Sequence, residues 1–233
     1  MRKRKLQKVA YYFILLFLLS SNIVFAQFKK DSILLFNNRD LTSINVLTTE
    51  ETYLGKKSLK VSDNGDNTEV KFVKINNLDF KNGIIEIDVS GKPAENAEEG
   101  ARGFVGIAFR INSDNTRFEC IYLRPTNGRA DDQIRRNHSV QYISFPDFPI
   151  YKLRKDFPEK YESYVDLISG EWTKIKIEVN GDKANLFVHG NLQPTLKVND
   201  LKLGADNNGG IGLWIGPGTE AHFSNPIITK FDK

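Results

Sequence analysis

The sequence predicts an all-β protein folded as a two-sheet antiparallel sandwich. Several short segments alternate apolar and polar residues with a period of two, as strands with one buried face do. The clearest is residues 174–179, where Ile175, Ile177 and Val179 alternate with lysine and glutamate. Glycine- and asparagine-rich turns separate the segments, and neither a long amphipathic helix pattern nor an internal repeat interrupts them. These observations favour a sandwich or barrel over helical folds.

The first 26 residues have the three parts of a secretory signal peptide. Five lysines and arginines precede an apolar run from Val9 to Leu19, and Val24-Phe25-Ala26 stands before the expected cleavage point. The run is shorter than the roughly 20 residues that a membrane span needs, which favours cleavage over a membrane anchor. We therefore expect a secreted or periplasmic protein without a stable membrane anchor, whose residues 27–233 form a single domain.

The charge and the cysteine content limit the function classes. The whole sequence has a formal net charge of +4, and loss of the five basic residues of the signal segment, which has no acid, leaves −1. A mature chain without net positive charge argues against a nucleic-acid binder. Cys120 is the only cysteine, so an intrachain disulfide is excluded and the apolar core must hold the fold.

Strand patterns follow one another along the mature chain. After an expected edge strand within residues 32–45, they occupy residues 58–61, 70–75, 84–89, 103–111, 118–124, 174–179, 184–188 and 211–215. One parity of these strands should face a common core. The residues predicted to be buried there are Ile85, Ile87, Val105, Ile107, Phe109, Ile175, Ile177, Leu186, Val188, Leu213 and Ile215.

Residues 124–164 are expected to form a long loop. The segment mixes tyrosine, phenylalanine and proline with several arginines and His138. Loops of this length are usually functional or disordered, and the aromatic content argues against disorder. Two interpretations remain open: a rim over a ligand site, or a lid that packs over a sheet edge through its own side chains.

Two segments carry a resemblance to a known superfamily. Residues 170–190 read GEWTKIKIEVNGDKANLFVHG, and residues 209–225 read GGIGLWIGPGTEAHFSN. This pattern resembles the concanavalin A-like lectin/glucanase superfamily. The opening Leu34-Leu35-Phe36-Asn37, followed by Asp40-Leu41, is similar to the start of 3-keto-disaccharide hydrolase-like domains. The resemblance implies a two-sheet jelly roll with a concave face that meets carbohydrate, in a superfamily of sugar-binding modules, laminin-G-like modules and glycosidases.

One catalytic signature of the resembled superfamily is incomplete. Laminarinase-type glycosidases carry E-x-D-x-x-E on one strand. Glu86 and Asp88 match the first two acids, but Gly91 stands at the third position. Because a retaining mechanism needs two carboxyl groups, laminarinase chemistry is not expected here.

No metal site is predicted from the histidines. His138, His189 and His222 have a spacing that fits no known ligand pattern. The oxygen-rich residues 63–67 could hold calcium, but a polar hairpin turn explains them as well, and we favour the turn.

Three functional hypotheses follow. The first is a carbohydrate-binding or glycan-processing accessory protein, with a carbohydrate partner held by Arg110, Tyr122, Arg124, Gln141 and Trp214 on the concave face. Glu86, Asp88, His138 and His222 are expected to converge with them on that face. The second is a glycoside hydrolase or lyase of the keto-sugar hydrolase type, with the catalytic residues Glu86, Asp88, His138 and His222. The third is a laminin-G-like protein-interaction module. The sequence leaves the oligomeric state open.

Cleavage of the signal segment should give a mature protein that begins at Gln27, because the basic, apolar and small-residue regions stand in the order that signal peptidase requires. Intact-mass measurement of material recovered from outside the cytoplasm tests this expectation. Recovery of a chain with Met1 in the membrane fraction would contradict it.

Overall fold

The computed structural model describes residues 29–32, 40–66 and 68–231. The expected signal peptide and its cleavage point lie outside these residues, as does the Leu34–Asn37 part of the resemblance. Within the described residues, no helix is long and apolar enough to span a membrane.

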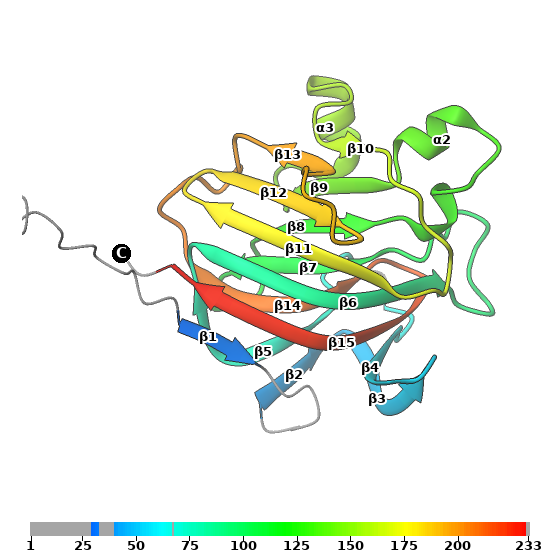
Figure 1. The fold of residues 1–233 in the computed structure, drawn as a ribbon, viewed down its shortest axis with the longest axis horizontal. Helices are drawn as coiled ribbons and strands as arrows, with labels where there is room; N and C mark the ends of the chain where they lie inside the picture. Colours follow the sequence, from blue (N-terminus) through cyan, green and yellow to red (C-terminus); the bar gives the residue numbers. More distant parts are fainter. Residues whose placement is uncertain (1–28, 33–39, 67, 232–233) are drawn as a thin grey trace, which may run out of the picture. The chain divides into compact units, whose positions relative to one another are not determined.

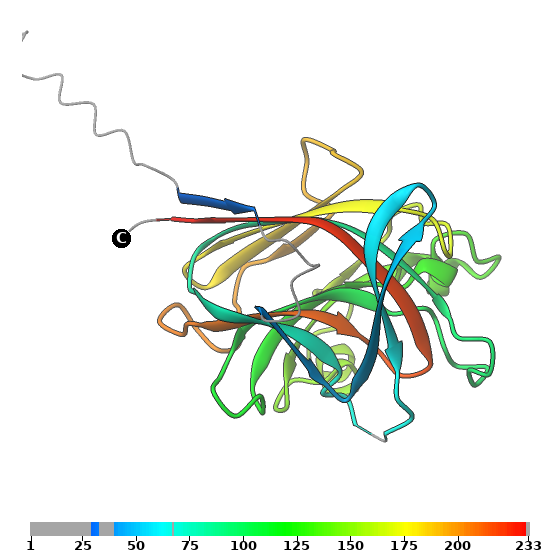
Figure 2. The ribbon, with the colours of Figure 1, turned by 90° about the horizontal axis from the view of Figure 1, so that it is seen from below.

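The described chain forms two antiparallel sheets, seen as separate layers in Figures 1 and 2. Sheet A contains, in spatial order, β13 (Leu196–Val198), β12 (Lys183–Val188), β11 (Thr173–Asn180), β6 (Gly83–Pro93), β15 (Thr219–Lys230), β4 (Lys56–Asp63) and β3 (Val46–Tyr53), with β1 (Lys29–Ser32) also paired to β15. Sheet B contains β10 (Glu162–Ser163), β9 (Val140–Phe145), β8 (Phe118–Leu123), β7 (Val105–Ile111), β14 (Gly209–Ile215), β5 (Phe72–Phe80) and β2 (Leu41–Ile44). The predicted all-β sandwich is confirmed.

The core lies between the two sheets and follows the predicted parity. In sheet A, β6 and β11 pair with Ile85 opposite Ile177 and Ile87 opposite Ile175. In sheet B, Leu213 of β14 lies opposite Ile107 of β7. Every residue predicted for the core is buried.

Glycines allow the turns and the close approaches that this packing needs. Gly181, with φ of 60°, follows Asn180 in the tight hairpin between β11 and β12. Gly91 of β6 faces the other sheet, where a Cβ atom would lie 2.7 Å from the Val105 side chain. Gly91 is therefore part of the core contact, with no room for the carboxylate of a laminarinase signature.

The structure differs from the expected long loop at residues 124–164. This segment contains the 3₁₀ helix η2 (Pro125–Asn127), the helices α2 (Gln133–Asn137) and α3 (Ile150–Asp156), and the strands β9 and β10. Strand β9 pairs with β8 along its whole length, so it extends sheet B where the loop was expected. The apolar residues of β9 do not alternate with polar ones, because both faces of this strand are covered.

Truncation of the core residue Leu213 to alanine should destabilise the protein by roughly 2–5 kcal/mol, because the lost contacts leave a cavity between the sheets. Chemical denaturation measures this change in the free energy of unfolding. Leu192→Ala is the matched control: Leu192 is 93% exposed, so the same truncation should cost under about 0.5 kcal/mol. Equal costs at both sites would argue against the packing described here.

Candidate functional site

One row of side chains crosses the outer face of sheet B, the face turned away from sheet A. Strand pairing places Trp214 beside Gly106, Gly106 beside Tyr122, Tyr122 beside Gln141, and Gln141 beside Glu162. We call these five residues the Trp214 row. They come from β14, β7, β8, β9 and β10, so the row exists only when the whole sheet is assembled.

The glycine in the Trp214 row lets two aromatic rings meet. A Cβ atom on Gly106 would lie 2.5 Å from the Cβ atom of Tyr122. With that space free, the rings of Tyr122 and Trp214 approach to a centroid distance of 4.8 Å. Both side chains are almost completely buried. The indole Nε1 of Trp214 donates to the carbonyl of Glu69 at 3.3 Å.

Charged groups gather at the β10 end of the row. Arg154 of α3 donates to both oxygens of Glu162, at 2.9 and 2.6 Å. Nε2 of His138 lies 3.7 Å from Glu162 Oε2. Burial lowers the pKa of His138, while the hydrogen bond to Glu162 raises the pKa of Arg154. The group is thus a fixed ion pair beside a histidine that favours its neutral form.

Arg124 follows β8 and connects the charged groups to the aromatic rings. Its guanidinium carbon lies 5.5 Å from the Phe104 ring and 5.8 Å from the Tyr122 ring. Its Nη2 is 3.5 Å from the Tyr122 hydroxyl, which donates to Gln141 Oε1 at 2.7 Å. Burial raises the pKa of Tyr122 to about 12, so the phenol stays protonated as a donor.

These residues border a small cavity. Its volume is about 130 Å³, and its lining is Glu69, Phe104, Tyr122, Arg124, Ile143, Ile150, Trp214 and Pro217. Next to it, two buried donors have no hydrogen-bond partner among the described residues: Nε of Arg124 and Nε2 of Gln141. Because buried polar groups are normally paired, these two donors are available to an acceptor that enters the cavity.

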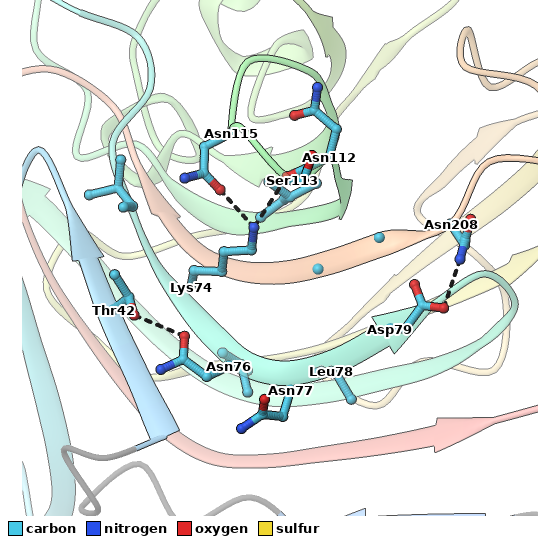
Figure 3. A pocket seen from close by; sticks show the side chains of 15 residues that line it. Thr42, Lys74, Asn76, Asn77, Leu78, Asp79, Asn112, Ser113, Asn115 and Asn208 are labelled. Atoms are coloured by element: carbon cyan, nitrogen blue, oxygen red, sulfur yellow. Dashed lines mark hydrogen bonds between the residues drawn. The ribbon is translucent and has the colours of Figure 1, made fainter.

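A second, larger hollow lies on the β5 side of sheet B (Figure 3). Its volume is about 720 Å³, and several asparagines line it, among them Asn112 and Asn115. Lys74 reaches across it and donates to Asn112 O at 3.2 Å and Asn115 Oδ1 at 2.7 Å. Thr42 and Asn208 also bond to neighbours within the hollow. Its prominent polar groups thus already have partners.

Two predicted site residues lie on the other sheet. Glu86 and Asp88 belong to β6 and point to the outer face of sheet A. Asp88 accepts from Lys56 at 2.8 Å and from Asn225 at 3.0 Å. Both side chains lie on the face of β6 opposite its buried residues, as expected. The expected convergence with Trp214 and Arg124 was wrong, because the outer faces of the two sheets point away from each other.

His222 also lies on the outer face of sheet A, although it is buried. The Tyr53 ring stacks on it at a centroid distance of 3.7 Å. Its Nε2 is 2.7 Å from Glu51 Oε1. Burial lowers the pKa of His222 despite this carboxylate. His222 is therefore remote from the Trp214 row, and its contacts join β15 to β3 within sheet A.

Arg110 was expected to bind ligand, but the structure gives it structural contacts. It is 1% exposed and sits at the end of β7 with φ of 53°. It donates to the carbonyls of Lys81, Gly181 and Gly204, at distances between 2.7 and 3.2 Å. These contacts tie three turns together and leave the guanidinium away from the cavity.

The loop considered for calcium is occupied by a lysine. Nζ of Lys71, which is fully buried, donates to Asp63 Oδ1 and to the Asp66 carbonyl, both at 2.6 Å. Hydrogen bonds from Lys71, Gly218 and Gly65 lower the pKa of Asp63 against the opposing effect of burial. No cluster of three or more histidine, cysteine or acidic residues suited to a metal occurs in the described part of the chain.

The sequence patterns did not mark Glu162, Arg154 and Phe104 as site residues. Glu162 and Arg154 lie in the segment that was expected to be a loop, where no alternation marks a face. The signal present in the sequence was the high content of arginine and aromatic residues in residues 124–164. By contrast, the structure brings five of the predicted residues together as one group: His138, Tyr122, Arg124, Gln141 and Trp214.

Comparison with known proteins identifies the fold. No protein-family model matches the chain, and no curated protein matches it. The carbohydrate-binding module CBM66 from Bacillus subtilis is similar with a TM-score of 0.52 and 15% identity, over 80% of this chain and 93% of the module. A putative glycosyl hydrolase from Parabacteroides distasonis is similar with a TM-score of 0.53 and 12% identity, over 87% and 100%.

A third solved structure, a protein of unknown function with a galectin-like fold from Bacillus subtilis, has a TM-score of 0.52 and 12% identity, over 88% of this chain and 100% of that one. At these identities the likeness shows the fold alone. It confirms the predicted two-sheet antiparallel jelly roll, and the activities named in those structures belong to those proteins.

Stability should fall as the pH drops below the ordinary histidine range. His222 has a lowered pKa in the folded protein, so the unfolded chain takes up its proton first, near pH 6.5. Stability is then lost from that pH down to the lower pKa of the folded state. His138 contributes with the same sign.

Urea denaturation between about pH 7.5 and pH 5 measures this dependence. His222→Gln should reduce the loss, because the substituted side chain does not titrate. His189→Gln, at an exposed position, is the matched control and should behave as the wild type. An unchanged pH dependence in His222→Gln would show that His222 does not contribute.

Proposed function

We propose that this chain is a secreted carbohydrate-binding or glycan-processing accessory protein whose sugar site is the cavity beside Tyr122, Arg124 and Trp214. The observation that carries the proposal is the combination of that cavity, its aromatic lining and two unpaired buried donors. The signal-peptide pattern of residues 1–26 supports secretion.

The lining suits the two kinds of surface that a sugar presents. A sugar ring has an apolar face of C–H groups, which packs on aromatic rings such as those of Tyr122, Trp214 and Phe104. It also has oxygens, which can accept from Arg124 Nε and Gln141 Nε2 after local adjustment of these side chains. The cavity of about 130 Å³ is smaller than the roughly 300–1,000 Å³ of typical ligand pockets, so a single terminal sugar unit is the fitting ligand.

The fold supports the same proposal. A carbohydrate-binding module is among the solved structures with a similar fold, over most of both chains. Since one fold carries many functions, the specific contribution comes from the residues of the cavity.

A second candidate function is a hydrolase or lyase that acts on a sugar in the same cavity. The observation that favours it is the contact between His138 and Glu162 at the β10 end of the Trp214 row. His138, which favours its neutral form, would serve as base, Glu162 would position it, and Arg124 would stabilise negative charge. In this hypothesis His138→Gln abolishes turnover while the folded protein still binds sugar, and Glu86→Gln retains turnover.

Trp214→Ala should weaken glycan binding by about 1 kcal/mol or more, roughly fivefold in Kd, because the ring contact is lost. Calorimetric titration with a ligand identified on a glycan array measures the change. Since Trp214 is buried, Gln141→Leu is a second variant that removes a donor and keeps both rings. Glu86→Gln, on the opposite sheet, is the control and should bind as the wild type.

Folding of each variant is checked by its melting curve before titration. If both cavity variants bind glycan with wild-type affinity, the sugar binds at a site other than this cavity. If the wild type binds no glycan on the array and hydrolyses no keto-sugar, the laminin-G-like interaction hypothesis replaces the carbohydrate proposal.

A further inference from the structure

The guanidinium of Arg124 brings a positive charge to the lining of the cavity, and this charge favours an anionic ligand. We propose that the sugar bound beside Arg124 carries a carboxylate, so that the ligand is an acidic glycan with a terminal hexuronate. The proposal rests on the function proposed above, since it assumes that the cavity binds a sugar.

Arg124 is a buried cation without a carboxylate partner. It is 9% exposed, and a guanidinium remains charged at every physiological pH. No ion pair joins it to any carboxylate in the described residues; its contacts are the Tyr122 hydroxyl at 3.5 Å and the faces of two aromatic rings. Because a buried charge without an opposite charge is costly, an anion in the cavity would be strongly favoured.

The neighbouring acids do not neutralise Arg124. Glu162 accepts two hydrogen bonds from Arg154 and is committed to that pair. Glu69 lines the opening of the cavity, but it is exposed and contributes its backbone carbonyl to Trp214. The buried carboxylate of Glu162 therefore belongs to the pair with Arg154 and does not neutralise Arg124.

Further arginines make this end of the protein more basic. After burial, the nearby charges of Arg135 and Arg124 are the main causes that lower the pKa of Arg102. Such like-charge proximity is unfavourable, although Glu99 offsets part of it at Arg102, and an anion in the cavity relieves it.

A carboxylate fits the unpaired donors better than a hydroxyl does. Arg124 presents its N–H groups in one plane, with Nε unpaired, and a carboxylate can accept two parallel hydrogen bonds from such a fork. Nε2 of Gln141 is the next unpaired donor in the Trp214 row. A neutral sugar would supply oxygens but would leave the charge of Arg124 without an opposite charge.

Three matched ligands test the proposal on the wild-type protein by calorimetric titration. They are a short uronate oligosaccharide, the same oligosaccharide with its carboxyl groups reduced to hydroxymethyl groups, and a sulfated neutral oligosaccharide. The uronate form should bind about 10-fold more tightly than the reduced form, the scale of a hydrogen-bonded charge pair. This comparison requires no variant to fold.

Arg124→Gln should weaken binding of the uronate form about 10-fold more than binding of the reduced form, and so abolish the preference for the uronate. Arg129→Gln is the matched control, because Arg129 is 59% exposed and pairs with Asp166 on the surface; it should keep the preference. Melting curves establish that both variants are folded.

The outcomes separate the two proposals. Equal affinity for the uronate and reduced oligosaccharides would contradict the proposal of a carboxylate-bearing ligand, but not the proposal that the cavity binds a sugar. Tighter binding of the sulfated ligand than of the uronate overturns the carboxylate in favour of a sulfate ester. If none of the three ligands binds and a glycan array is also negative, the carbohydrate function itself fails.

Discussion

The close packing of sheet A on sheet B is the constraint on which the other features depend. At Gly91 of β6 the sheets approach so closely that a Cβ atom would lie 2.7 Å from the side chain of Val105 in β7. Packing of this kind assigns one parity of each central strand to the core. The side chains of the opposite parity then lie on two outer faces that cannot meet. The Trp214 row is the part of one such face where aromatic and charged groups are continuous.

The sequence predicted the parity of the strands but not their sheets. Glu86 and Trp214 each lie opposite the core parity, as their alternating neighbours indicated. Parity is a local property, visible within a few residues. Membership of a sheet depends on pairing between distant segments: β6 pairs with β15, and β14 pairs with β5 and β7. The two residues were therefore expected together, although they lie on opposite sides of the protein.

The candidate site was predictable to the extent that its residues lie on patterned strands. Tyr122 and Trp214 could be assigned a face from their neighbours, and Gln141 and Arg124 were recognised by residue type. Glu162 could not be assigned a face, because β10 is only two residues long and shows no alternation of apolar and polar residues. Its partner Arg154 comes from a short helix, and only the folded segment brings the two together. Short elements in long connections are thus where sequence patterns give least information.

Lys71 supplies the positive charge that holds the oxygen-rich loop of residues 63–66 together, which the composition of the loop alone does not indicate. Oxygen-rich loops of this kind commonly take their order from a metal ion in solution, so their conformation follows the concentration of that ion. Here the positive charge at the centre belongs to the chain itself, as a fully buried ammonium group bonded to Asp63 and Asp66. Because the ammonium group is part of the Lys71 side chain, every copy of the loop contains it. The order of this loop therefore comes from a side chain of the protein itself and not from a bound ion.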